Sequence, residues 1–94
     1  HNWKVEVAVA SKKLNKIGLA VDFKVLKRTL ENIIARLDHK YLNEIPPFDK
    51  ENPSSENIAR YIFKQFQKEI KGKDIKAERV KVWESENAAA VYYE

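Results

Sequence analysis

The sequence contains no cysteine and no methionine, and its 94 residues include only two histidines and two glycines. Without cysteine it can form neither a disulfide framework nor a cysteine-containing zinc cluster. Gly18 and Gly72 are too few for a glycine-rich phosphate loop. No apolar run approaches the roughly 20 residues of a membrane helix, and no signal-peptide pattern opens the chain. We therefore expect a cytoplasmic protein without membrane contact. Because the first residue is His1, we also expect these residues to begin inside a longer polypeptide.

Hydrophobic residues make up 44% of the sequence and charged residues 34%, which is typical of one small globular domain spanning residues 1–94. The formal net charge is +4 and the isoelectric point is near 9.3. A basic chain can bind nucleic acid or another anion. The lysines are interleaved with glutamates, however, which is the usual pattern of a solvated surface.

The first segment alternates apolar and polar residues. Val5, Val7 and Val9 are separated by Glu6 and Ala8, and this period of two predicts a half-buried strand that begins near Trp3. The polar residues 11–18 predict a loop, and residues 19–21 a short extended piece.

Two helices follow. Asp22 is a candidate N-cap, and apolar residues recur behind it at three- and four-residue spacing. These residues are Phe23, Leu26, Leu30, Ile33, Ile34 and Leu37. The prolines between 38 and 53 predict an irregular segment. Ser54 or Ser55 then caps a second helix that ends at Gly72. Its apolar stripe contains Ile58, Ile62, Phe66 and Ile70, with Ala59, Tyr61 and Phe63 beside them.

The end of the chain predicts a hairpin, with strands at 76–84 and 88–93 joined by a turn at 85–87. The order β-α-α-β-β predicts an α+β fold in which two helices cover one face of an antiparallel sheet. The first strand needs a partner, and a strand preceding residue 1 would complete a ββααββ arrangement with four strands.

A few positions carry side chains that could act in catalysis or ligand binding. His39 follows Asp38 at the end of the first helix, where a histidine either complements the helix dipole or transfers protons with help from a carboxylate. Glu84 has the strand parity of the buried valines. It either lies in solvent beyond the strand or presents its carboxylate to a planar N–H array such as the edge of a pterin. The first interpretation of Glu56 is that its carboxylate stabilises the start of the second helix.

Five stretches together resemble the 6-pyruvoyltetrahydropterin synthase and 6-carboxytetrahydropterin synthase family. In chain order they are His1-Asn2-Trp3, Gly18-Leu19-Ala20-Val21-Asp22-Phe23, Leu37-Asp38-His39-Lys40-Tyr41-Leu42-Asn43, Asn52-Pro53-Ser54-Ser55-Glu56-Asn57 and Val82-Trp83-Glu84-Ser85. The run 37–43 together with the stretch 82–85 is the most specific part of the resemblance.

The resemblance implies the tunnelling fold, in which four-stranded sheets join into a barrel, as trimers or hexamers with active sites between subunits. It implies a zinc ion held by three histidines, of which His1 is one, and proton transfer by Asp38 and His39. It implies that Glu84 anchors the pterin ring and that Glu56 and Ser55 belong to the same pocket. Bound zinc would polarise the substrate side chain.

The implied substrate is 7,8-dihydroneopterin triphosphate, which loses triphosphate in a carbon–oxygen lyase reaction. The favoured product is 6-carboxy-5,6,7,8-tetrahydropterin, for the queuosine or archaeosine route, and the biopterin route of 6-pyruvoyltetrahydropterin synthase is the alternative. A tunnelling-fold protein without catalysis and a nucleic-acid-binding module are further alternatives. The nucleic-acid-binding module is disfavoured because most aromatic residues lie on the apolar stripes.

Overall fold

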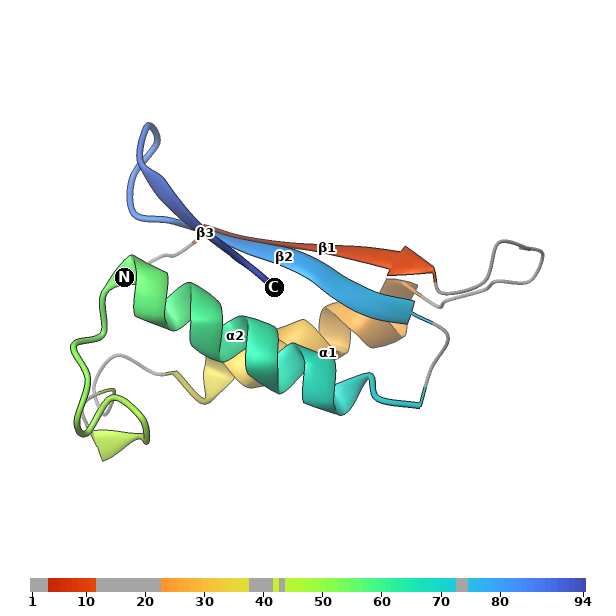
Figure 1. Ribbon diagram of the computed structural model, residues 1–94, viewed down its shortest axis with the longest axis horizontal. Helices are drawn as coiled ribbons and strands as arrows, with labels where there is room; N and C mark the ends of the chain where they lie inside the picture. The colour runs from red at the N-terminus through yellow and green to blue at the C-terminus, as the bar shows by residue number, and fades with distance from the viewer. Residues whose placement is uncertain (1–3, 12–22, 38–41, 43, 73–74) are drawn as a thin grey trace.

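A computed structural model describes residues 4–11, 23–37, 42, 44–72 and 75–94. Its elements are β1 (Lys4–Ser11), α1 (Phe23–Ala35), α2 (Ser55–Glu69), β2 (Ile75–Trp83) and β3 (Ala89–Tyr93). The strands form an antiparallel sheet in the order β1-β2-β3, and both helices lie on one face of it (Figure 1). The predicted α+β class and the helix pair on one face are thus confirmed. The described residues provide three strands, and the predicted fourth strand stays a prediction.

The pairing of β1 with β2 changes register once. From Lys4 to Ala8 each residue of β1 opposes one residue of β2, but Val9 then pairs with Ala77, so Glu78 is an extra residue on β2. Such a bulge shifts the side-chain alternation by one position. The buried residues of β2 therefore fall into two pairs on the same face, Ile75 with Ala77 and Val80 with Val82. The sequence analysis did not predict this bulge.

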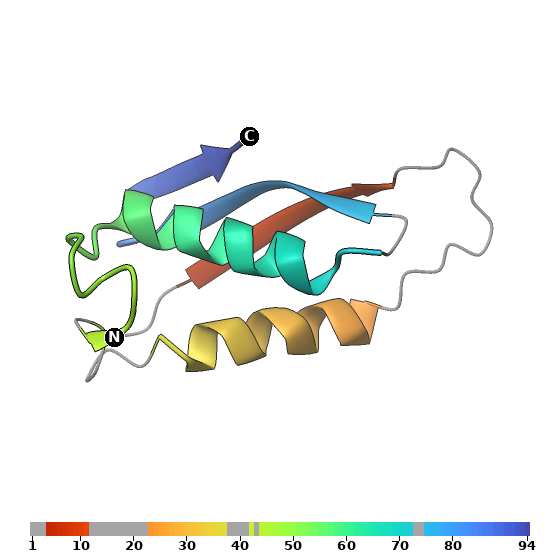
Figure 2. The same ribbon diagram turned by 60° about the horizontal axis from the view of Figure 1, so that its bottom comes forward.

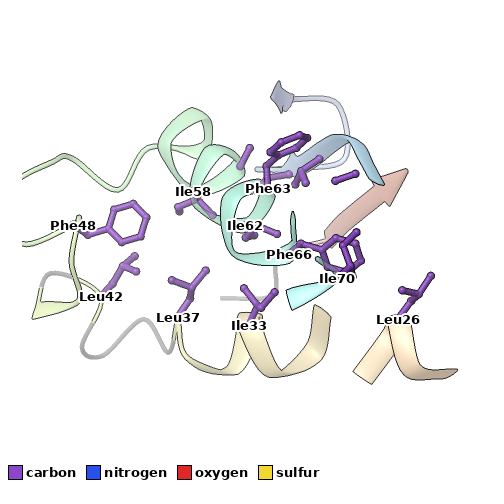
Figure 3. Packing of buried hydrophobic residues seen from close by; sticks show 14 of the residues in the cluster. Leu26, Ile33, Leu37, Leu42, Phe48, Ile58, Ile62, Phe63, Phe66 and Ile70 are labelled. Carbon is purple, nitrogen blue, oxygen red and sulfur yellow. The ribbon is translucent and has the colours of Figure 1, made fainter. Parts of the chain in front are cut away.

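Helix α2 is the central element of the core. Its buried residues fall at helical spacing, as predicted, and it packs against β2, β3 and α1 (Figure 3). They are Ser55, Ile58, Ala59, Ile62, Phe63 and Phe66. In Figure 3, Ile62 of α2 lies toward Ile33 of α1, while Phe63 lies on the other side of α2, toward the sheet. The helix ends at Glu69, and Gly72 follows in the left-handed region with φ of 94°. Only glycine adopts this conformation at low cost, so the predicted helix end is confirmed.

Helix α1 contributes a narrower apolar face. Leu26, Ile33 and Leu37 are buried, whereas Leu30 and Ile34 are half-buried. The helix lies beside α2, toward the β1 edge of the sheet (Figure 2). The valines of β1 that point to this side remain half-buried at the margin of the core.

Residues 44–54 connect the helices without a strand or an α-helix. The segment folds through short turns, in which the Phe48 N–H donates to the Ile45 carbonyl and the Lys50 N–H to the Pro47 carbonyl. Phe48 is buried against the ring of Tyr61, with centroids 5.4 Å apart. The predicted irregular segment is therefore packed against α2. No helix among the described residues is long and apolar enough to cross a membrane.

Candidate functional site

The turn between β2 and β3 carries the exposed carboxylate of Glu84. Strand β2 ends at Trp83, which pairs with Ala89, and the N–H groups of Glu84 and Ser85 both donate to the Ala88 carbonyl at 2.8 and 3.3 Å. The Glu84 side chain is exposed. Strand parity therefore fails at this residue because the ladder has already ended, and the placement of Glu84 among the buried valines is wrong. The alternative, an exposed carboxylate beyond the strand, is confirmed.

Glu84 lines an open hollow of about 400 Å³. The other lining residues are Lys4, Trp83, Ser85 and Glu86. Lys4 lies directly opposite Trp83 in the β1–β2 ladder, so the hollow brings the start of β1 to the end of β2. Because both side chains project from the sheet face opposite to Val5 and Val82, the hollow lies on the face that the helices leave open.

The ammonium groups of two lysines lie over the indole of Trp83. The Nζ atom of Lys4 lies 5.1 Å from the ring centroid, and that of Lys81 lies 4.3 Å from it. Both distances are in the range of cation–π attraction. The Nε1 atom of Trp83 is buried and has no hydrogen-bond partner in the part of the chain that the structure describes. A buried indole N–H usually has an acceptor, so this covered and unpaired donor needs an explanation.

The start of α2 contains the other predicted substrate residues. Ser54 is the N-cap, with φ of −72° and ψ of 165°, and its hydroxyl accepts the Asn57 N–H at 3.2 Å. This resolves the choice between Ser54 and Ser55. Ser55 is buried, and Glu56 is exposed in the first turn. The predicted role of Glu56 at the helix start is confirmed by its position, since a carboxylate there complements the helix dipole.

The start of α2, the 44–54 segment and the 84–88 turn lie at the same end of the molecule (Figures 1 and 2). No hydrogen bond joins Glu84 to Ser55 or Glu56 within the described residues. The structure therefore brings the three predicted substrate residues to one end and leaves open whether they share one pocket.

The predicted catalytic pair Asp38–His39 and the predicted zinc ligand His1 lie outside the described residues. Helix α1 ends at Ala35, and the Leu37 N–H donates to the Ile34 carbonyl at 2.8 Å. In the described ranges, no group of three His, Cys, Asp or Glu side chains could hold a metal ion. These ranges contain no histidine, so they do not supply the donor set of the predicted zinc site.

The sequence analysis missed Lys4, Lys81 and Trp83 as candidates. One signal was present, since Lys4 and Lys81 fall on the polar parity of two predicted strands. Their convergence on one indole depends on strand register, which the sequence did not reveal.

Comparison with known proteins identifies the family. A family model described as 6-pyruvoyl tetrahydropterin synthase matches residues 1–94. The chain belongs to the 6-pyruvoyl tetrahydropterin synthase family. The α+β arrangement of an antiparallel sheet and two helices is compatible with this family, and the resemblance drawn from the five sequence stretches is confirmed.

Three relatives to which this chain is similar are named for three different activities. A putative 6-carboxy-5,6,7,8-tetrahydropterin synthase of Archaeoglobus fulgidus is 40% identical over 87 residues, which cover 93% of this chain and 68% of the relative. A dihydroneopterin monophosphate aldolase of Pyrococcus furiosus is 36% identical over 84 residues, covering 89% and 68%. A 6-pyruvoyl tetrahydrobiopterin synthase of Poecilia reticulata is 36% identical over 72 residues, covering 74% of this chain and 49% of the relative.

Proposed function

We propose that this protein is a pterin-converting enzyme that acts on 7,8-dihydroneopterin triphosphate and water, releases triphosphate and the two outer side-chain carbons as acetaldehyde, and forms 6-carboxy-5,6,7,8-tetrahydropterin. The observation that carries the proposal is the exposed Glu84 carboxylate at the rim of an open hollow, in a chain of the 6-pyruvoyl tetrahydropterin synthase family. Similarity to the putative 6-carboxy-tetrahydropterin synthase supports the choice of product.

Glu84 binds the pterin ring in this proposal. A carboxylate accepts two parallel hydrogen bonds from an amino group and a neighbouring ring N–H, which is the arrangement along one edge of a pterin. Its exposed position beyond the strand supports this role, because neither oxygen is occupied by a hydrogen bond within the described residues. Ser55 and Glu56 begin α2 at the same end of the molecule, on the helix side of the sheet, and we assign them to the substrate site from that side.

Asp38 and His39 transfer protons at the substrate side chain. A histidine changes its protonation state near neutral pH, and a neighbouring carboxylate stabilises the imidazolium and orients the ring. The end of α1 at Ala35 supports this pairing, because residues that are adjacent on a regular helix do not face one another.

The zinc site is a separate part of the proposal. His1 supplies one nitrogen ligand, and the sequence has only two histidines, so a three-histidine site draws its remaining ligands from outside these 94 residues or from another subunit. Zinc bound there would act as a Lewis acid toward the substrate oxygen. Metal analysis of the full-length protein should find about one zinc per subunit, and a fully active protein without metal would exclude the site.

A fourth strand and subunit association complete the proposed architecture. The half-buried valines of β1 and the half-buried Leu30 and Ile34 of α1 form an apolar margin beside the outer edge of β1. A strand added to that edge would cover this margin and pair the backbone groups of β1 that have no ladder partner among the described residues. Assembly into a trimer or hexamer then closes the remaining sheet edges, and light scattering that found only monomers would reject it.

A second candidate function is aldol cleavage of a phosphorylated dihydroneopterin. It is favoured by the 36% identity to the dihydroneopterin monophosphate aldolase, over 89% of this chain. Both reactions break a carbon–carbon bond of the side chain, but they give different products. The synthase eliminates triphosphate and leaves a carboxylate on the ring, whereas an aldol cleavage leaves a hydroxymethyl group and keeps the phosphate ester intact on the released aldehyde.

The deciding experiment incubates full-length, zinc-loaded protein with dihydroneopterin triphosphate and, separately, with the monophosphate. Release of inorganic triphosphate with a 6-carboxylated pterin supports the synthase. A shortened pterin together with a phosphorylated aldehyde supports the aldolase instead, and absence of both products rejects the enzyme proposal.

Glu84→Gln tests the ring-binding role. The amide replaces one acceptor oxygen by a donor, so affinity for the pterin should fall roughly tenfold or more. Glu86→Gln is the matched control, because Glu86 lines the same hollow two residues along the same turn. Equilibrium titration measures both variants, and equal affinities for the two would contradict the role of Glu84.

A further inference from the structure

Lys4, Trp83 and Lys81 form one unit on the helix-free face, which we call the lysine–tryptophan group. Lys4 faces Trp83 across the β1–β2 ladder, and Lys81 precedes Trp83 by two residues on the same face. Both ammonium groups contact the same indole, at the distances given above. The group stands beside Glu84, since Lys4, Trp83 and Glu84 line one hollow.

The two lysine charges are not neutralised by carboxylates of the described residues. Lys81 pairs with Glu6 across the ladder, yet no ion pair within 4 Å joins them, and Lys4 has none either. An indole attracts a cation through the electron density of its face but does not cancel its charge. Both ammonium groups therefore keep N–H donors for an anion, although Glu6, Glu84 and Glu86 nearby reduce the local positive potential.

The indole N–H points to the same kind of ligand. The buried Nε1 atom of Trp83 lacks an acceptor among the described residues, and leaving such a donor without one is unfavourable. An oxygen of an anion that displaces the atoms covering this nitrogen would supply that acceptor. The group thus offers donors of two kinds, ammonium and indole N–H, and no acceptor.

We propose that the lysine–tryptophan group binds the phosphorylated side chain of the pterin whose ring Glu84 holds, an inference that rests on the proposed function. The hollow then has two chemically opposite ends. The carboxylate accepts hydrogen bonds from the ring edge, while Lys4 in the hollow, Lys81 beside it on the same face and the Trp83 N–H donate to phosphate oxygens. This arrangement selects phosphorylated over unphosphorylated pterins.

The test compares two ligands, dihydroneopterin and dihydroneopterin triphosphate, by equilibrium titration of the full-length protein. Lys4→Gln and Lys81→Gln should each weaken binding of the triphosphate about 10- to 100-fold and leave binding of dihydroneopterin nearly unchanged. Lys76→Gln is the matched control, because Lys76 is an exposed lysine of β2 that pairs with Ala10 at the far end of the strand. It should change neither affinity.

A Trp83→Phe variant separates the indole N–H from the aromatic face. Phenylalanine keeps a ring for both lysines but has no donor, so binding of the triphosphate should weaken by only about threefold to tenfold. The far-ultraviolet circular dichroism of each variant should match that of the unmodified protein.

Inorganic triphosphate is the third probe and separates the two levels of the proposal. Binding of inorganic triphosphate that depends on Lys4 and Lys81, without binding of either pterin, would keep the anion site and overturn the proposed function. Unchanged triphosphate affinity in both lysine variants, or equal loss for both pterins, would overturn the anion site alone. Failure of the unmodified protein to bind any of the three probes would overturn both.

Discussion

At the scale of single residues, the candidate site depends on where the β2–β3 ladder stops. Pairing ends at Trp83 with Ala89, so Trp83 still projects from the sheet while Glu84 already belongs to the turn. One residue more in the ladder would have turned the Glu84 side chain toward the buried valines, where an unpaired carboxylate is costly. The predicted strand 76–84 runs one residue too far, because strand parity alone does not mark the residue at which pairing stops.

His39→Ala tests the proposed proton transfer at the residue scale. Loss of the imidazole should lower the turnover number by about 100-fold or more, while the affinity for the pterin stays close to that of the unmodified protein. Lys40→Ala is a suitable control, since it changes the next residue of the same segment without removing a group that titrates near neutral pH. Equal turnover in the two variants would exclude the role of His39.

Sequence reasoning identified Glu84, Ser55 and Glu56 through a resemblance, and it could not identify the lysine–tryptophan group. The parity of Lys4 and Lys81 indicated only that both are polar positions of strands. Their meeting at Trp83 requires the pairing of Lys4 with Trp83, which depends on contacts between residues 79 positions apart. Such long-range pairing leaves no local trace in the chain.

At the scale of elements, helix α2 was largely predictable and strand β2 was not. The apolar spacing, the capping serine and Gly72 each carry a local physical reason for the helix and its ends. The bulge at Glu78 left one local signal, because the apolar alternation shifts by one residue between Ala77 and Val80, but two adjacent charged residues there do not show which of them is extra. Only the pairing of β2 with β1 shows which residue of β2 is extra.

Ser54→Ala tests the start of α2. Removal of the hydroxyl that accepts the Asn57 N–H should lower the free energy of unfolding by about 1 kcal/mol. Ser85→Ala is the control, because its hydroxyl accepts the Asn87 N–H at 3.4 Å in an exposed turn outside any helix. Urea denaturation measures both, and a Ser54→Ala variant no less stable than Ser85→Ala would contradict the capping role.

At the scale of the whole molecule, β3 is tied to α2 by packing and by a surface network. The rings of Phe63 and Tyr92 meet edge to face at 5.3 Å. Beyond them, the carboxylate of Glu94 accepts hydrogen bonds from the Lys64 ammonium at 2.8 Å and from the Tyr92 hydroxyl at 2.6 Å. This arrangement of helix pair over sheet was predicted from element order, whereas the fourth strand concerns residues beyond the described part.

The network predicts a pH dependence. Hydrogen bonds from Lys64 and then Tyr92 lower the pKa of Glu94, and the bond to Glu94 raises the pKa of both Lys64 and Tyr92. The lowered pKa of the Glu94 carboxyl contributes stability when the pH is above the ordinary pKa of a glutamate. This stability is lost as the pH falls through the lowered pKa. The raised pKa values of Lys64 and Tyr92 contribute stability when the pH is below the ordinary pKa of each group. This stability is lost as the pH rises through the raised pKa values in strong base. The contribution is small, because all three groups are exposed to solvent.

Glu94→Gln should therefore move the pKa of Tyr92 back toward the ordinary value of a tyrosine, since the hydroxyl then donates to a neutral amide. Nuclear magnetic resonance titration of a ring-labelled tyrosine measures the shift. Glu86→Gln removes an exposed carboxylate from the distant turn and should leave the pKa of Tyr92 unchanged. Equal titration curves for the two variants would show that the network does not form in solution.

The extra residue in β2 also bears on how the chain tolerates changes of length. Without Glu78, Arg79 would follow Ala77, and Val80 would follow Arg79, so inward and outward positions would alternate without interruption along the strand. The ladder with β1 would then keep one register from Lys4 to Ser11. Removal of a residue on either side of the bulge, at Lys76 or Lys81, would instead turn part of the strand inside out. Glu78 is thus a position at which this sheet accepts a one-residue deletion, and homologous chains that differ in length by one residue in this strand have a structural reason to differ there.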